Sequence, residues 1–163
     1  MAVRSKTTKK TPARQRPARP AARKSVRQRA VPSLAQERSR LERNKKLVIA
    51  FYQKLIGEKD LPAARRFMGE RYVQHSPYAT DGHEGVAEFV ADFKQRFPRH
   101  HYDVKRVIAE GDYVVLHLHG KEGLFPHGEA VIDIFRVVDG RVVEHWDVIQ
   151  ALPEKSRNPN TPF

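Results

Sequence analysis

The segment from Ala130 to Gln150, AVIDIFRVVDGRVVEHWDVIQ, constrains the fold of this 163-residue chain more than any other stretch. Its apolar residues on either side of Asp139-Gly140 predict two long strands folded back on each other through a tight turn. Four polar groups lie among those apolar residues: Asp133, Glu144, His145 and Asp147. A solvated hairpin would need fewer apolar neighbours, so we expect some of these polar groups to line a pocket.

Before this hairpin, the spacing of apolar residues is helical up to Pro98 and alternates as in strands after it. Apolar residues at three- and four-residue steps predict three helices, which span residues 41–56, 60–68 and 84–97. Period-two alternation predicts extended segments, which span residues 72–78, 102–110 and 113–119. Helices followed by a run of antiparallel strands are typical of the α+β class.

The positive charge of the chain lies almost entirely at its N-terminus. Residues 1–30 hold eleven Lys and Arg and no acid, and therefore account for all but one of the net +12 charges. With little to bury, residues 1–33 are predicted to be a disordered basic tail. Residues 34–152 then form one domain, and residues 153–163 a short polar tail.

Two interpretations of the basic arm, residues 4–29, remain open. In the first, its Lys and Arg side chains make ionic contacts with the phosphates of nucleic acid or with another polyanion, and this binding weakens as the salt concentration rises. In the second, it is a solvated tail with no specific partner. If the arm binds a polyanion, deletion of residues 1–33 should abolish binding to DNA or RNA at low salt. A truncated protein that binds as well as the full chain would identify the arm as a tail only.

Several function classes are excluded by what the sequence lacks. It has no cysteine, which excludes disulfides, thiolate metal sites and a cysteine nucleophile. It has no dinucleotide fingerprint, Walker loop or nucleophile elbow, so hydride transfer and serine hydrolysis are poor candidates. No long apolar run or apolar secretory leader is present, and we expect a cytoplasmic protein that does not enter the membrane. The acid-free arm would also suit mitochondrial import in a eukaryote.

Asp133 and Asp147 are the candidates for acid/base chemistry, one on each arm of the hairpin. A carboxylate in an apolar pocket under covering helices has its pKa raised toward the range useful for proton transfer. A three-residue loop would place the two carboxylates opposite each other, whereas a two-residue turn would place Asp133 opposite Trp146. Alternatively, one carboxylate only pairs with Arg136 or Arg106, or faces solvent.

The histidines allow a metal hypothesis and a hydrogen-bonding hypothesis. His117 and His119 share one face of a predicted strand and could bind an ion together with His75 or Asp133. Only that alternation supports the metal hypothesis, so we expect no metal site. A histidine that orients substrate or a carboxylate is favoured, with His75 as the candidate. His100 and His101 are expected at the surface.

Two stretches carry a resemblance to a known family: YVQHSP at residues 72–77 and IDIFRVVDGRVVEHWD at residues 132–147. Together with the order of elements over residues 41–152, they resemble the SnoaL-like polyketide cyclase branch of the nuclear-transport-factor-2-like superfamily. The resemblance implies a cone-shaped α+β fold, in which helices cover one face of a curved antiparallel sheet around a ligand pocket. It also implies a homodimer.

In the cyclases of that family, an aspartate on the last strand serves as acid/base for an intramolecular aldol ring closure, without a metal or organic cofactor. Asp147 matches that position, and His75 matches a histidine after the first helices. Asp133 falls where the cyclases carry a histidine, which is a departure from the family pattern.

These observations support two hypotheses of different classes. The first is a cofactor-independent acid/base catalyst, of aldol-type cyclase or isomerase type, acting on a small apolar carbonyl substrate. In it Asp147 moves the proton and Asp133 or His75 orients the enolate. The expected substrate-binding residues are Trp146, Phe135, Tyr72, His117 and Phe51. The second hypothesis is a non-catalytic ligand-binding or dimerisation module with a polyanion-binding arm.

Overall fold

The computed structural model describes residues 31–163, and residues 32–163 form one compact unit. The predicted polyanion-binding arm, residues 4–29, and nearly all of the predicted disordered tail lie outside the described residues. The helical elements are α1 (Leu34–Tyr52), the π-helical turn η1 (Gln53–Gly57), α2 (Leu61–Arg65) and α3 (Gly82–Arg96). The strands are β1 (Met68–Gln74), β2 (His101–Glu110), β3 (Tyr113–Lys121), β4 (Glu129–Val138) and β5 (Arg141–Ala151).

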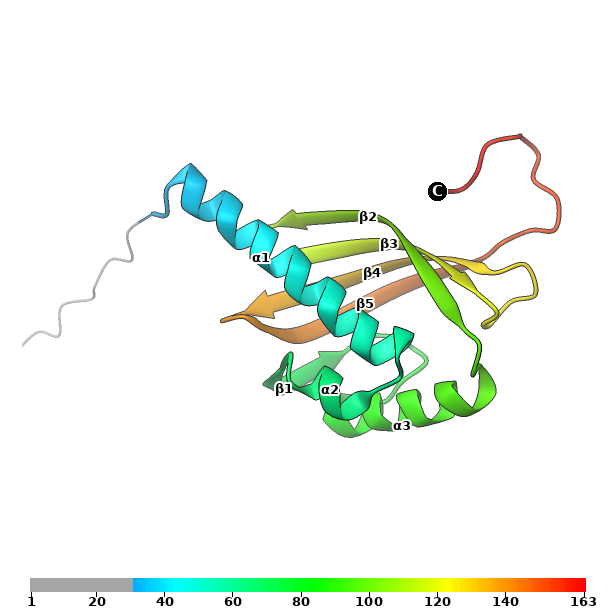
Figure 1. The fold of residues 1–163 in the computed structure, drawn as a ribbon, viewed down its shortest axis with the longest axis horizontal. Coiled ribbons are helices and arrows are strands. Elements are labelled where there is room, and N and C mark those ends of the chain that lie inside the picture. The colour runs from blue at the N-terminus through cyan, green and yellow to red at the C-terminus, as the bar shows by residue number, and fades with distance from the viewer. Residues whose placement is uncertain (1–30) are drawn as a thin grey trace, which may run out of the picture. The chain divides into compact units, whose positions relative to one another are not determined.

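The five strands form one sheet in the order β1-β5-β4-β3-β2, and the helices lie over one of its faces (Figure 1). Strands β2 to β5 pair antiparallel as predicted, whereas β1 pairs parallel with β5, so the sheet is mixed. No hairpin joins β1 to β5, and turn geometry therefore does not impose an antiparallel direction on that pair. The predicted α+β class, with a curved sheet covered by helices on one side, is confirmed.

The first helix begins earlier than its apolar stripe indicates, because a capping box starts it. The Ser33 hydroxyl accepts a hydrogen bond from the Gln36 backbone, and the Gln36 side chain accepts one from the Ser33 backbone. Asp60 caps α2 as predicted, but α2 ends at Arg65. Met68, which was expected at the end of that helix, begins β1 instead and is buried in the core.

The core lies between the helices and the inner face of the sheet. Alternate residues of β3 are fully buried, namely Val114, Leu116 and Leu118. On the helical side Phe51 is fully buried and its ring meets the edge of Phe135 at 5.7 Å between centroids. This packing fixes α1 against β4, the strand that carries Asp133.

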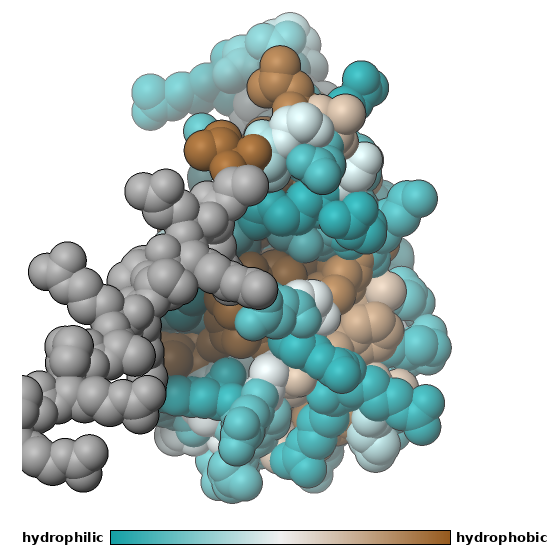
Figure 2. All heavy atoms as spheres, turned by 90° about the vertical axis from the view of Figure 1, so that its left-hand side faces the viewer, coloured by the Kyte–Doolittle hydropathy of each residue, from teal (hydrophilic) through white to brown (hydrophobic). Residues whose placement is uncertain are grey.

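The face of the described unit that Figure 2 shows is mostly hydrophilic. Figure 2 shows one face, where hydrophilic side chains surround smaller hydrophobic areas. Among the described helices, none is both long and apolar enough to cross a membrane.

Candidate active site

A β-bulge in the β4–β5 hairpin decides which way its carboxylates point. The turn is the two-residue Asp139-Gly140, and both residues have positive φ, 48° and 70°, as a type I′ turn requires. Val137 pairs with Val142 but Arg136 pairs with Glu144, which leaves Val143 as the extra residue of a bulge. The bulge shifts the register by one, so Asp133 lies opposite Asp147 despite the two-residue turn.

The sequence allowed two combinations of turn length and pairing for this hairpin, and each of them is correct in only one part. The two-residue turn is present, but the pairing of Asp133 with Trp146 that it implied is wrong. The pairing of Asp133 with Asp147 is present, but a bulge and not a three-residue loop produces it.

A cavity lies between the inner face of the sheet and the helices. Its sheet side presents the row Glu129, Val131, Asp133 and Phe135 of β4 beside His145, Asp147 and Ile149 of β5. Its helical side is largely apolar, with Leu55, Ile56, Phe89 and Phe93. The cavity volume is about 160 Å³, which is room for on the order of ten water molecules. The site therefore suits a small organic molecule with an apolar body.

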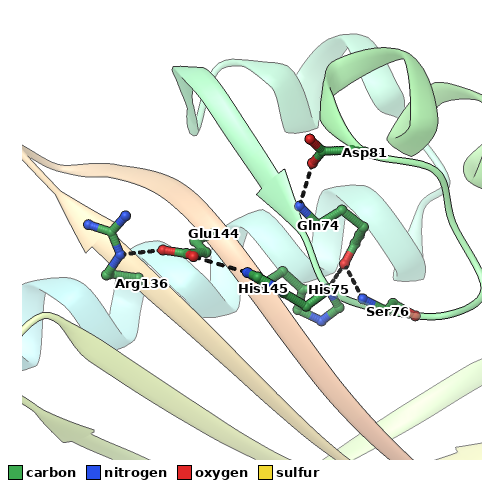
Figure 3. A network of polar contacts seen from close by, with 7 residues as sticks. All are labelled: Gln74, His75, Ser76, Asp81, Arg136, Glu144 and His145. Atoms are coloured by element: carbon green, nitrogen blue, oxygen red, sulfur yellow. Dashed lines mark hydrogen bonds and ion pairs between the residues drawn. The ribbon is translucent and has the colours of Figure 1, made fainter.

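Both ring nitrogens of His145 have a hydrogen-bond partner. Its Nδ1 lies 2.8 Å from Gln74 Oε1, which also accepts the Ser76 backbone N–H at 2.9 Å (Figure 3). Since a backbone N–H needs an acceptor, the amide oxygen of Gln74 must face Ser76, and it therefore also faces His145. His145 thus donates its Nδ1–H to Gln74.

The other ring nitrogen of His145 shares a proton with Asp133. His145 Nε2 lies 2.9 Å from Asp133 Oδ1, and both side chains are largely buried. With Nδ1 already carrying hydrogen, this contact is either imidazolium with carboxylate or neutral imidazole with a carboxylic acid. In both cases the pair holds one transferable proton inside the cavity.

Asp147 is half-buried beside this pair, and its Oδ2 accepts a hydrogen bond from the Ser76 hydroxyl at 2.7 Å. Burial raises the pKa of Asp147 above its ordinary value, and the negative charge of Asp133 acts in the same direction. The Ser76 hydrogen bond and the charge of His145 oppose the rise without cancelling it. A carboxylate with a raised pKa is a stronger base than an exposed aspartate.

Two tyrosines complete this end of the cavity. Tyr52 and Tyr72 are buried and line the cavity wall. Burial, and next the charge of Asp133, raises the pKa of each hydroxyl well above its ordinary value. Both hydroxyls therefore stay protonated and are available as hydrogen-bond donors. Tyr52 ends α1 next to the π-helical turn, a feature frequent at functional sites.

Four of the predicted site residues do not line the cavity. Trp146 lies between His145 and Asp147 in sequence, and side chains alternate along a strand, so it points to the outer face. His75 is also on that face, stacked on Trp146 at 4.6 Å and hydrogen-bonded to Glu144 at 3.0 Å. His117 contacts Arg106 and Phe163 instead. The expected pocket positions of Trp146, His75 and His117 are therefore corrected, and Phe51 belongs to the core.

The structure does bring four other predicted residues together around the cavity: Asp133, Asp147, Phe135 and Tyr72. It adds Gln74, Ser76, Tyr52 and His145 as their partners. His145 carried a sequence signal, since it follows the same alternation as Asp147. Gln74 and Ser76 carried none, because their role depends on the pairing of β1 with β5.

His117 and His119 lie on the outer face while Asp133 lies on the inner one, so these three cannot share an ion, and their combination with His75 is not among the described groups whose ligand atoms lie close enough to hold one. Among the described residues, one group could hold an ion: Asp133, His145 and Asp147, whose ligand atoms lie within 4.8 Å of one another. Both nitrogens of His145 already make hydrogen bonds, so an ion there would have to displace one of them.

A second polar pair lies in the cavity. His100, which was expected at the surface, is buried, and its Nε2 lies 3.2 Å from Glu129 Oε1. The correction has a physical reason: residue 100 precedes β2 at the end of α3, where the chain turns inward and the His100 ring packs against Phe93.

Solved structures of the same fold come from several bacteria. AclR from Streptomyces galilaeus is 24% identical, with 68% of this chain and 90% of AclR covered and a TM-score of 0.57. IdmH from Streptomyces antibioticus is 22% identical, with 65% and 91% covered and a TM-score of 0.55. A nuclear-transport-factor-2-like protein from Cytophaga hutchinsonii is 19% identical, with 66% and 89% covered and a TM-score of 0.52.

At these identities the solved structures establish the fold alone, and a search of curated proteins gives no match. The family model described as SnoaL-like polyketide cyclase matches residues 46–155. These residues include every strand from β1 to β5 and the whole polar cluster around Asp147. The chain belongs to the SnoaL-like polyketide cyclase family.

Proposed function

We propose that this protein is a cofactor-independent acid/base catalyst that moves a proton next to a carbonyl group of a small, largely apolar substrate. The reaction class is an aldol-type cyclisation or an isomerisation. One observation carries the proposal: a half-buried carboxylate with a raised pKa, Asp147, lies beside a buried pair, Asp133 and His145, that holds a proton.

Asp147 is the base in this proposal. Its exposure to the cavity leaves it able to reach a substrate, and Ser76 fixes one of its oxygens at 2.7 Å. Asp133 is less suited, because it is more deeply buried and one of its oxygens already bonds to His145. The two carboxylates thus have different roles, set by their surroundings.

The proton-holding pair and the tyrosines act on the carbonyl oxygen. When Asp147 takes a proton from the carbon next to the carbonyl, the electron pair of that bond moves onto the oxygen. The Asp133–His145 pair, together with Tyr52 or Tyr72, donates hydrogen bonds or a proton to this oxygen. In a cyclisation the enolate carbon then attacks a second carbonyl, the first carbonyl re-forms and gives any proton it received back to the pair, and the new alkoxide oxygen takes the proton from Asp147. In an isomerisation the first carbonyl re-forms in the same way, and Asp147 delivers its proton to another carbon.

Family membership supports the aldol-type branch of the proposal. IdmH is described provisionally as a polyketide cyclase, whereas AclR is described provisionally as a hydroxylase. Proteins of this fold thus carry different provisional descriptions, and fold alone does not choose the reaction, so the choice rests on the residues of the site. A base beside a proton donor in an apolar cavity fits enolate formation.

Exchange of hydrogen for deuterium in a small apolar ketone tests the base directly. The protein is mixed with 2-tetralone in D₂O, and loss of the protons next to the carbonyl is followed by NMR. We expect exchange above buffer, reduced about 10²- to 10⁴-fold in Asp147→Asn. Asp139→Asn, in the exposed turn of the same hairpin, is the matched control and should leave the rate unchanged.

Equal exchange rates for Asp147→Asn and the wild type would remove Asp147 as the base. A wild type no faster than buffer, with 2-tetralone bound in the cavity, would contradict the catalytic proposal. That result would favour the non-catalytic ligand-binding module. The homodimer, and polyanion binding through residues 4–29, stay predictions of the sequence.

A further inference from the structure

His100 and Glu129 form a pair that lines the same cavity as the proposed catalytic groups. Glu129 is at the start of β4, whereas Asp133 lies further along that strand. The two residues are among the most buried ionisable groups of the described chain, with 7% and 2% exposure. Burying two such groups is costly unless their hydrogen bonds are satisfied. Here only one bond is made, between Nε2 and Oε1 at 3.2 Å.

Each member of the pair keeps one polar atom without a hydrogen-bond partner among the described residues. These atoms are Nδ1 of His100 and Oε2 of Glu129. An unpaired buried polar atom costs about 1–3 kcal/mol, and such atoms in a cavity wall indicate a partner supplied by a ligand. Neither residue takes part in the acid/base step proposed above.

The surrounding chain holds the pair in place. A Cβ at Gly120 or Gly123 would come within 2.5 Å or 2.6 Å of Glu129 Oε1, so a larger residue at either position would displace the carboxylate from where it now lies. Lys59 Nζ donates a hydrogen bond to the His100 carbonyl at 3.1 Å, and the Phe93 ring packs against the His100 ring. The backbone is therefore shaped around the pair.

The spacing along β4 separates two polar ends of the cavity. Glu129, Val131 and Asp133 alternate on the inner face, and Val131 lies opposite Ile149 on β5. Four residues of an extended strand span roughly 13 Å between Glu129 and Asp133. The cavity thus has a polar cluster at Asp133 and Asp147, an apolar middle, and a second polar pair at Glu129.

We propose that His100 and Glu129 form a second subsite that binds a hydroxyl group at the end of the substrate remote from its reacting carbonyl. If the imidazole is neutral and donates Nε2–H to Glu129, both remaining atoms are acceptors; if it is protonated, Nδ1 becomes a donor. A hydroxyl group both donates and accepts, so in either state it can bond one of the two free atoms: it donates to Glu129 Oε2 or to a neutral Nδ1, or it accepts from a protonated Nδ1. This inference deepens the proposed function, because it rests on the same cavity being the substrate site.

Two probes that differ by one hydroxyl group test the subsite in the full-length protein. 6-Hydroxy-2-tetralone carries a carbonyl on one ring and a hydroxyl at the far end of the other, and 2-tetralone lacks the hydroxyl. Dissociation constants are measured by isothermal titration calorimetry. We expect the wild type to bind the hydroxylated probe at least tenfold more tightly. In Glu129→Met the two constants should fall within about twofold of each other.

Ile149→Ala is the matched control, because Ile149 lines the apolar middle. It should weaken both probes equally and keep their ratio. A wild-type ratio near one, or a ratio that survives in Glu129→Met, would overturn the subsite and leave the pair as an internal structural contact. If Glu129→Met does not fold, a crystal structure of the wild type with the hydroxylated probe decides. A hydroxyl bonded to Glu129 or His100 supports the proposal, and a hydroxyl elsewhere overturns it.

The binding experiment involves no turnover, so its outcome is separate from that of the exchange experiment. A wild-type preference for the hydroxylated probe that is lost in Glu129→Met, together with no ketone exchange, would contradict the catalytic function alone. Exchange that depends on Asp147 without any preference between the probes would contradict the second subsite alone.

Discussion

The two faces of the β4–β5 hairpin each carry a histidine–carboxylate pair of nearly the same length. On the inner face His145 lies 2.9 Å from Asp133, with side chains 12% and 5% exposed. On the outer face His75 lies 3.0 Å from Glu144, with side chains 40% and 17% exposed. The contact geometry is therefore shared, and the difference lies in burial and in the neighbouring groups.

The carboxylates of Glu144 and Asp147, which lie on opposite faces of β5, have pKa values shifted in opposite directions. On the outer face, the His75 hydrogen bond first, and then Arg136 at 2.6 Å, holds the pKa of Glu144 below its ordinary value (Figure 3). On the inner face, burial raises the pKa of Asp147. One strand thus carries a stabilised anion on one side and the proposed base on the other, and burial rather than pairing with a histidine distinguishes the two carboxylates.

The largest difference between the two faces should appear in stability. Asp133→Ala leaves the buried His145 without its carboxylate, and losing one partner of a buried pair costs about 3–5 kcal/mol. Glu144→Ala breaks a more exposed pair and should cost about 1 kcal/mol or less. Urea denaturation of the two variants measures both free energies of unfolding. Equal losses would show that the inner pair is not distinguished by its burial.

Variants of the inner and outer histidines should also differ in the rate of hydrogen–deuterium exchange of 2-tetralone. His145→Gln removes the imidazole that shares its proton with Asp133, and the rate should fall about a hundredfold. His75→Gln changes the outer pair in the same way and should leave the rate within about twofold. A comparable fall in both variants would mean that His75 reaches the substrate from the outer face, contrary to its stacking on Trp146.

Much of the fold was predictable from sequence, because long periodic segments determine their own secondary structure. The hairpin at Asp139-Gly140 follows from turn chemistry, and the helix over residues 82–96 follows from its apolar stripe. The parallel pairing of β1 with β5 was not predictable, because it joins segments far apart in sequence without a connecting turn.

The candidate site was predictable only in part. Alternation places Asp147 and His145 on one face whatever the register, but Asp133 joins them only because of the bulge at Val143. A bulge adds one residue without a distinct sequence signature, so the register of Asp133 could not be settled from sequence. The expectation of Trp146 in the pocket beside Asp147 was wrong for another reason: neighbouring residues of a strand point to opposite faces. His100 was missed for a related reason: its burial depends on the packing of α3 against the sheet and not on local pattern.

The smallest expected difference concerns the pH dependence of stability. The folded-state pKa of Asp147 is raised above 3.8, so the native state keeps this proton to higher pH than the unfolded chain does. Its contribution to stability is therefore present at low pH and is lost as the pH rises through that raised value. Asp147→Asn should then be more stable than the wild type at neutral pH, by less than about 1 kcal/mol because solvent screens a half-exposed carboxylate.

Glu144 gives the opposite sign and completes the comparison. Its folded-state pKa lies below 4.5, so its contribution is present above that pH and is lost as the pH falls through the lowered value. Glu144→Gln should therefore be less stable than the wild type at pH 7, and the two should converge in acid. Urea unfolding of both variants from pH 3 to pH 7 gives the two curves. Parallel curves, with the same sign for both variants, would mean that the two faces of the hairpin do not differ electrostatically, and Asp147 would then lose its physical basis as a base.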